Sequence, residues 1–182
     1  DTSALAGSAG AVVIRHPVNR DQGAALATGN AYALGRGADI IVHFDADGQH
    51  LAAEIPDAVA PLLSGEADVV LGSRFLGKRS ELPWAKERLL FPLARLVNRW
   101  LLGAVLTDPQ SGFRALSRAA AEKIVIKQDG KAHCSEILHQ IFKHKLKVKE
   151  VPVTVLYRRF GVDLRGGITI IKDLLLAKLI DG

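Results

Sequence analysis

Two acidic residues spaced one residue apart, Asp45 and Asp47, follow an apolar stretch and precede a glycine. Residues 40–44 (IIVHF) show no clean alternation of apolar and polar side chains, which is typical of a strand buried on both faces of a parallel sheet. Both carboxylates should then lie at the carboxyl end of the strand, where open α/β sheets bind ligands. Carboxylate oxygens there suit Mg²⁺ or Mn²⁺ shared with the phosphates of a substrate. The spacing therefore favours a site for a metal and a diphosphate.

Other structures can begin with the same residues. An Asp-x-Asp-Gly sequence after a strand is also typical of a plain turn, and the spacing alone leaves that alternative open. An EF-hand loop is excluded because Gly48 comes too early and Pro56 stands where the loop needs its bidentate Glu. His43 and His50 could complete a zinc set, although a histidine on a buried strand is more often a core residue.

Further side chains with possible chemistry carry weaker signals. Arg74 and Arg114 each end a strand-like segment, and a forked guanidinium group suits a pair of phosphate oxygens. Cys134 follows His133 but has no third partner in the sequence, so a structural cysteine is the preferred interpretation.

Composition limits the class of protein. The chain has 182 residues, of which 48% are hydrophobic, and this favours one folded domain over disorder. A net charge of +5 suits phosphorylated substrates, anionic membranes or nucleic acid, but an aromatic content of 5% offers few surfaces for base stacking. A single cysteine excludes an internal disulfide and indicates a reducing compartment.

The elements that should position these residues alternate between strand and helix in the first half of the chain. This βαβ pattern predicts a parallel sheet with right-handed crossovers. Asp21 is expected to cap the first helix. Pro56 and Pro61 should interrupt the second helix. The predicted strands are residues 11–15, 40–44 and 68–71, and the predicted helices are residues 22–34 and 51–63, after a possible helix end at residues 2–9.

The second half contains two apolar, basic helices whose environment the pattern leaves open. Residues 84–106 fit either a core helix or a helix at a membrane interface, with Arg88, Arg95 and Arg99 at helical spacing. Residues 168–180 fit either a core lid or a foot on a membrane surface. The other predicted elements are a strand within residues 107–117 that carries Arg114, helices at 118–126 and 135–144, and a strand at 148–157.

Several separated motifs together make this sequence closely similar to the inverting family-two glycosyltransferases of GT-A fold. Within that family it most resembles the branch of dolichol-phosphate mannosyltransferases and polyprenyl-phosphate glycosyltransferases. The order and spacing match from near Asp1 to about Tyr157. The motifs are NRDQGAA at residues 19–25, DADGQH at 45–50, DVVLGSRF at 68–75, DPQSGFR at 108–114, SEI at 135–137 and EVPV at 150–153.

The resemblance implies an α/β GT-A fold: a Rossmann-like, mostly parallel sheet flanked by helices, together with interfacial helices. Family members open with strands carrying Pro-x-x-Asn-Glu and Asp-Asp-Gly-Ser, which this sequence lacks, so we expect an N-terminally truncated chain. Its domains would be a partial GT-A domain at residues 1–160 and an amphipathic helix at 161–182. Asp21 stands where the family commonly has Gly, and Asp tolerates left-handed backbone geometry better than most residues.

The resemblance also implies roles for individual residues. The metal would neutralise the leaving nucleotide diphosphate. An acceptor phosphate is already anionic near neutral pH, so positioning and electrostatics would supply most of the rate. The implied metal and donor ligands are Asp45, Asp47 and Gln49; the implied acceptor-phosphate contacts are Arg74, Ser111 and Arg114; and Asp47, Arg74 and Arg114 are the implied catalytic residues.

The expected activity is metal-dependent transfer of a hexose, either mannose or glucose/N-acetylglucosamine, from a nucleotide diphosphate sugar to a polyprenyl or dolichyl phosphate. The expected location is the cytoplasmic face of a membrane, peripheral or anchored, with no nucleic-acid partner. One alternative is transfer to a sugar hydroxyl, with Glu136 as the base. The other is a non-catalytic GT-A binding module, and the chain alone could be inactive. The sequence names neither the sugar nor the lipid.

Overall fold

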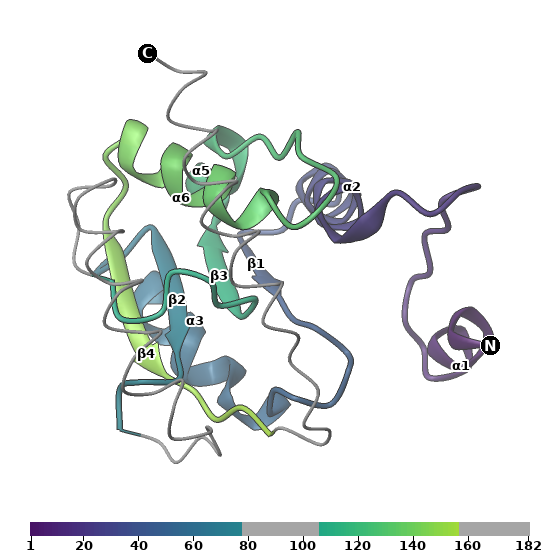
Figure 1. Ribbon diagram of the computed structural model, residues 1–182, viewed down its shortest axis with the longest axis horizontal. Coiled ribbons are helices and arrows are strands. Elements are labelled where there is room, and N and C mark those ends of the chain that lie inside the picture. Colours follow the sequence, from purple (N-terminus) through teal and green to yellow (C-terminus); the bar gives the residue numbers. More distant parts are fainter. Residues whose placement is uncertain (78–105, 157–182) are drawn as a thin grey trace, which may run out of the picture.

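The computed structural model describes residues 1–77 and 106–156 (Figure 1). The predicted helix at 168–180 and the C-terminal segment 161–182 lie outside these residues. The same holds for the predicted helix at 84–106, apart from Leu106. None of the helices within the described residues is long and apolar enough to cross a bilayer.

Four strands form one mixed sheet in the order β1-β3-β2-β4. They are β1 (Ile40–His43), β2 (Val69–Ser73), β3 (Arg114–Ser117) and β4 (Val148–Pro152). Strands β1, β2 and β4 run in one direction, as the βαβ pattern predicts, and β2 pairs in parallel with β4. Strand β3, however, lies between β1 and β2 and is antiparallel to both. Helices flank the sheet as expected, but the sheet is mixed, because β3 pairs antiparallel with both of its neighbours.

The position of β3 determines which loops meet. Arg114 pairs in register with His43 on one side and with Leu71 on the other. Arg114 thus begins a strand, where the sequence pattern indicated that it ends one. Because β3 runs against its neighbours, the loop that leads into it arrives at the edge where β1 and β2 end. Residues 108–113 therefore lie between the segments that follow those two strands.

Helices cover both faces of the sheet, and each face has its own apolar core. The first core joins β2 and β3 to α5 (Arg118–Lys123) and α6 (His133–Lys143), and α2 (Asp21–Gly35) packs at its side. The second core joins the opposite face to α3 (Ile55–Leu63). Neighbouring residues alternate between these cores. The first contains Val69, Leu71 and Leu116, and the second contains Val70, Phe113 and Ala115.

The two prolines of the predicted second helix occupy different positions in the structure. A 3₁₀ turn, η1 (Ala52–Glu54), precedes α3, and Pro56 occupies the first turn of α3. The missing N–H of proline is tolerated there because the first helical N–H groups have no partner within the helix. Pro61 lies inside the helix. The predicted interruption is confirmed at Pro56 but is wrong at Pro61, because α3 continues through that residue to Leu63.

The start of α2 differs from the prediction in one respect. Asp21 does not cap the helix, since the cap position belongs to Arg20 and no side chain makes a capping hydrogen bond. Asp21 instead has a positive φ of 61°, and its backbone N–H donates to Asn19 Oδ1 at 2.9 Å. The left-handed geometry expected at this glycine-like position is therefore confirmed.

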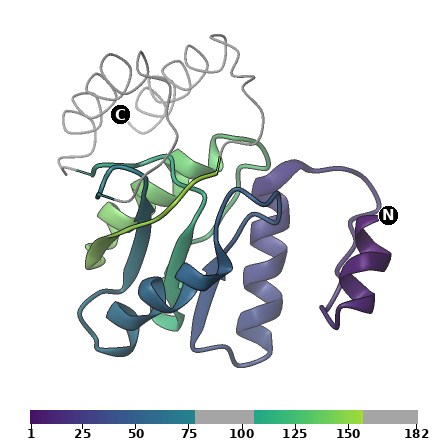
Figure 2. The ribbon, with the colours of Figure 1, turned by 90° about the horizontal axis from the view of Figure 1, so that it is seen from below.

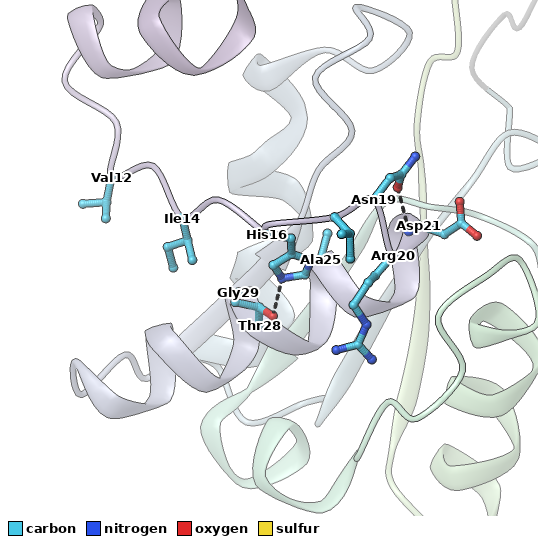
Figure 3. Close-up of a pocket in the computed structure, with 10 residues that line it drawn as sticks. Val12, Ile14, His16, Asn19, Arg20, Asp21, Ala25, Thr28 and Gly29 are labelled. Atoms are coloured by element: carbon cyan, nitrogen blue, oxygen red, sulfur yellow. Dashed lines mark hydrogen bonds between the residues drawn. The ribbon is translucent and has the colours of Figure 1, made fainter.

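Residues 11–15 do not form the predicted strand. A short helix, α1 (Thr2–Ser8), precedes them, and Figure 2 shows α1 standing apart from the sheet, beyond α2. Val12 is 68% exposed and Ile14 is 45% exposed. A cavity of about 560 Å³ lies between this segment and α2, where His16 Nε2 is 2.9 Å from Thr28 Oγ1 (Figure 3). Strand propensity is not enough here, because a strand also needs a neighbouring backbone to pair with.

Candidate active site

The turn after β1 holds the two carboxylates in different ways. Asp45 is partly buried, and its Oδ1 accepts a hydrogen bond from Gln22 Nε2 at 2.8 Å. Asp47 is exposed, and its Oδ1 accepts from the backbone N–H of Gln49 at 2.9 Å. Gly48, which lies between Asp47 and Gln49, has a φ of 75°. Asp47 therefore closes a local turn, so the plain-turn interpretation describes the backbone correctly without removing the carboxylate from the surface.

The loop before β3 lies directly against Asp45. A Cβ atom added to Gly112 would be 2.7 Å from Asp45 Oδ2, which is closer than real Cβ contacts. Only glycine leaves room for the carboxylate at this position. The DADGQH and DPQSGFR motifs, which are more than 55 residues apart in the sequence, thus share one edge of the sheet.

Arg74 forms a bidentate ion pair with Asp108. The Nε–Oδ2 distance is 2.6 Å and the Nη2–Oδ1 distance is 2.7 Å, while the Arg74 backbone N–H donates to Oδ2 at 3.2 Å. The side chain of Asp108 is 2% exposed and that of Arg74 is 21% exposed. A forked pair of this kind sets the plane of the guanidinium group as well as its position. The sequence motif contained Asp108, but its spacing assigned no role to this residue.

Glu150 on β4 accepts hydrogen bonds from the segment that contains Asp108. Its Oε1 accepts from Thr107 Oγ1 at 2.9 Å and from the Asp108 backbone N–H at 3.0 Å, and both carboxylate oxygens are 2.9 Å from the Thr107 N–H. Ser73, at the end of β2, contacts the Thr107 hydroxyl at 2.5 Å. Strands β2 and β4 are therefore both connected to the loop before β3 through hydrogen bonds that hold Asp108 in place. The role of Glu150 could be suspected from sequence only through its place in the EVPV motif.

His50 lies between the carboxylate turn and the ion pair. Its ring centroid is 6.3 Å from that of Phe44 and 5.4 Å from that of Phe113. Burial lowers the pKa of His50 below its ordinary value; Asp45 and Asp47 oppose this, and the charges of the ion pair act on it in opposite directions. All four charged side chains are therefore close enough to act on one imidazole, which stays neutral at neutral pH.

Ser111 and Arg114 are placed beneath this edge. Ser111 is 6% exposed, and its hydroxyl contacts the backbone N–H and carbonyl of Phe113 at 3.3 and 3.4 Å. Arg114 is fully buried, and its Nη2 donates to Cys134 Sγ at 3.1 Å. Gln49 lies in the carboxylate turn, where its backbone carbonyl accepts from the Leu156 N–H at 2.9 Å. The structure thus brings Asp45, Asp47, Gln49 and Arg74 to one edge, and separates Ser111 and Arg114 from its surface.

Glu136, the base in the alternative mechanism, has a structural task. Its Oε2 accepts hydrogen bonds from the backbone N–H groups of Lys127 and Gln128 at 2.9 and 3.0 Å. It thereby holds the loop before α6 against the first turn of that helix.

His43 is a core histidine, as its strand position predicts. It is 3% exposed, and its Nε2 contacts Asn30 Oδ1 at 2.9 Å. Burial, with smaller effects of Arg114 and His133, lowers the pKa of His43 to about 3. No group of three or more His, Cys, Asp or Glu side chains within residues 1–77 and 106–156 could hold a metal ion.

The donor set nevertheless fits a divalent cation shared with a substrate. Asp45 and Asp47 supply hard carboxylate oxygens from the same turn at the carboxyl end of β1. Mg²⁺ in phosphate-handling sites is usually bound by one or two carboxylates plus the phosphates themselves, without a cage made only of protein ligands. This chemistry matches two carboxylates and does not require a third.

Fold and site together define a GT-A glycosyltransferase domain, an α/β sheet with acidic residues at the carboxyl end of strand β1. Residues 2–125 match the glycosyl transferase family 2, and the chain belongs to that family.

Named relatives agree with this assignment. The chain is 34% identical over 182 residues to UDP-N-acetylglucosamine–dolichyl-phosphate N-acetylglucosaminyltransferase of Methanococcus voltae, which covers 92% of this chain and 70% of that protein. It is 34% identical over 149 residues to polyprenol monophosphomannose synthase of Mycolicibacterium smegmatis, which covers 80% of this chain and 56% of that protein.

A solved structure supports the fold. Glucosyl-3-phosphoglycerate synthase from Mycobacterium tuberculosis, crystallised with Mn²⁺, UDP-glucose and phosphoglyceric acid, superposes with a TM-score of 0.68 at 25% identity. The match covers 96% of this chain and 63% of that chain. This chain therefore spans only part of the length of each of these three proteins.

Proposed function

We propose that this protein transfers a hexose, with inversion and with the help of a divalent metal, from a nucleotide diphosphate sugar to a polyprenyl or dolichyl phosphate. The observation that carries the proposal is the meeting of two charged groups at one edge of the sheet. The Asp45 and Asp47 turn supplies negative charge, and Arg74, held by Asp108, supplies positive charge nearby. A donor diphosphate with its metal and an acceptor phosphate need such neighbouring sites of opposite sign.

On the donor side, Asp45 and Asp47 would hold the metal, and Gln49 would assist from the same turn. When bound, Mg²⁺ or Mn²⁺ neutralises charge on the departing nucleotide diphosphate. The contact of Gly112 with Asp45 and the hydrogen bond from Gln22 restrict this carboxylate to one orientation. A preorganised carboxylate loses less entropy when the metal binds.

On the acceptor side, Arg74 is the residue best placed to attract a phosphate. Its ion pair with Asp108 leaves the guanidinium oriented but partly accessible, at 21% exposure. An acceptor phosphate carries its own negative charge and needs no strong base, which agrees with the structural use of Glu136. The sugar-hydroxyl alternative is less well supported, because the Glu136 carboxylate already binds two backbone N–H groups of the loop before α6.

The acceptor class is supported by the names of two relatives, which act on dolichyl phosphate and form a polyprenol monophosphate sugar. A lipid acceptor would place the enzyme at a membrane surface, and a nucleotide-sugar donor would place it on the cytoplasmic face. The sugars named for the relatives differ, so the donor is proposed as a hexose or N-acetylhexosamine nucleotide.

The test is a transfer assay with the full-length protein. GDP-mannose, UDP-glucose and UDP-N-acetylglucosamine would each be offered with polyprenyl phosphate in vesicles, with Mn²⁺ and then with a chelator. We expect transfer from one donor that the chelator abolishes. Asp47→Asn should lower the rate roughly 100-fold or more, which is typical for loss of one electrostatic contact to the transition state. Glu122→Gln, at an exposed ion pair on α5, is the matched control and should leave the rate unchanged.

Two outcomes would redirect the proposal. Transfer to a sugar hydroxyl but not to polyprenyl phosphate would support the alternative acceptor. Absence of transfer and of metal-dependent nucleotide-sugar binding, in a protein shown to be folded, would indicate a non-catalytic module.

A further inference from the structure

Among residues 1–77 and 106–156, Arg114 has a buried positive charge without a carboxylate partner. It is fully buried on β3, and the alternation of that strand directs it to the face covered by α6. Its Nη2 donates to Cys134 Sγ at 3.1 Å, whereas Nε and Nη1 have no hydrogen-bond partner within the described part of the chain. A buried cation is costly unless an anion compensates it. The sulfur of Cys134 is the group in contact that can take a negative charge.

His133 contacts the same sulfur atom through its imidazole ring. Its Nδ1 donates to the Gly130 carbonyl at 2.7 Å, and its Nε2 lies 3.4 Å from Cys134 Sγ, to which it donates when the imidazole is protonated. His133 is 1% exposed. Sequence reasoning left Cys134 and His133 without a third partner, and the fold supplies Arg114 as that partner from a different element.

The electrostatics agree with this geometry. Burial alone raises the pKa of the Cys134 thiol, but the hydrogen bond from His133 and the positive charge of Arg114 outweigh it and lower the pKa from 9.0 to about 7. Burial likewise tends to lower the pKa of His133, but its interactions with Cys134 and Gly130 raise it. His43 on β1 faces the same group and stays neutral, and Glu136 on α6 bonds to the preceding loop.

We propose that Cys134 is a modification site, at which a thiolate stabilised by Arg114 and His133 reacts with peroxide oxidants and with soft alkylating electrophiles. Cys134 is only partly buried, so small reagents can reach the sulfur. It lies on the first turn of α6, and it is the single cysteine of this sequence. The site is separate from the carboxylate turn and from the Arg74 ion pair, and it does not depend on the transferase proposal.

The oxidative step balances with hydrogen peroxide as the only co-reactant. The thiolate attacks one peroxide oxygen, an S–O bond forms and the O–O bond breaks. Sulfur loses two electrons and becomes a sulfenic acid, while the other oxygen leaves as hydroxide and is protonated to water. Alkylation by iodoacetamide forms an S–C bond and releases iodide.

The first experiment measures the rate of iodoacetamide labelling of the full-length protein between pH 6 and 9, with the peptide that contains Cys134 quantified by mass spectrometry. We expect a half-maximal rate near pH 7, against about pH 8.5 for an ordinary thiol. At pH 7 this makes labelling on the order of tenfold faster than for an unperturbed cysteine. A midpoint at or above pH 8.5, or labelling only after denaturation, would overturn the proposal.

Two variants separate the His133 contact from general effects. His133→Gln should slow labelling at pH 7 several-fold and move the midpoint to higher pH. His144→Gln, at the exposed C-cap of the same helix, should change neither quantity. Equal profiles for wild type and a folded His133→Gln would contradict the assignment to His133.

The second experiment treats the protein with hydrogen peroxide and traps sulfenic acid with dimedone. A dimedone adduct on the Cys134 peptide, absent from Cys134→Ser, is the expected result. A folded protein that gives no adduct at peroxide concentrations that consume an exposed low-pKa thiol would refute the oxidative part.

Discussion

Arg74 and Asp108 face each other across the end of the sheet, with both guanidinium-to-carboxylate hydrogen bonds shorter than 2.8 Å. Arg74 follows β2 and Asp108 precedes β3, so the ion pair joins two segments that the antiparallel pairing of these strands brings together. The pair is nearly closed to solvent on the Asp108 side.

Asp108→Asn tests this pair because it removes the negative charge and nearly preserves the shape. Loss of one partner of a largely buried pair leaves the other charge uncompensated, so we expect the free energy of unfolding to fall by about 2 kcal/mol or more. Urea unfolding measures this change. Glu66→Gln removes a similarly short but exposed ion pair with Lys149 and should cost no more than about 0.5 kcal/mol. Equal effects of the two substitutions would show that Asp108 does not compensate a buried charge.

Gly112→Ala should displace the Asp45 carboxylate without unfolding the protein. The added Cβ would meet Asp45 Oδ2 at 2.7 Å, and the end of a side chain can move aside at small cost. We therefore expect weaker Mn²⁺ binding, by on the order of tenfold, with little change in melting temperature. Gly29→Ala, a position on α2 with no heavy atom within 4 Å of the added Cβ, is the control. Unchanged Mn²⁺ affinity in Gly112→Ala would mean that the orientation of Asp45 is not needed for metal binding.

The stability of the protein should depend on the ionisation of Cys134 between about pH 7 and pH 9. The folded-state pKa is about 7, below the 9.0 of the unfolded thiol, so the stabilisation is fully present above pH 9 and is lost as the pH falls through 7. His133 acts oppositely, because a raised pKa gives stability that is present below pH 6.5 and is lost as the pH rises through its folded-state pKa.

Comparison of wild type with Cys134→Ser isolates the cysteine. The difference in unfolding free energy between the two should grow by roughly 2 kcal/mol from pH 7 to pH 9, since two pKa units correspond to that order of magnitude. Urea unfolding at several pH values would give the difference directly. A difference that stays constant with pH would show that the thiol has the same pKa in both states.

Asp21→Gly should stabilise the protein. A non-glycine residue with φ of 61° carries a steric cost that glycine avoids, and the expected gain is about 0.5 to 1 kcal/mol. Asp39→Gly, an exposed position outside the left-handed region, serves as the control and should be neutral or destabilising. Destabilisation by Asp21→Gly would indicate that the aspartate side chain makes a contact more valuable than the backbone strain.

The sequence alone determined the local features of the site. The apolar run of residues 40–44 predicted β1, and the residue types after it predicted the turn that carries Asp45 and Asp47. The proline positions predicted the break before α3. These features depend on backbone preferences and apolar patterns within a few neighbouring residues, which a sequence displays directly.

Only the tertiary structure decided which distant residues meet. The insertion of β3 between β1 and β2 paired Arg74 with Asp108, placed Gly112 against Asp45 and buried Arg114 beside Cys134. The tertiary structure also leaves residues 11–15 outside the sheet despite their apolar, β-branched composition. The same packing directs the Glu136 carboxylate to backbone hydrogen bonds. Strand order and side-chain burial depend on which edges and faces remain available once the other elements have packed. Residue spacing alone does not show which edges and faces remain available.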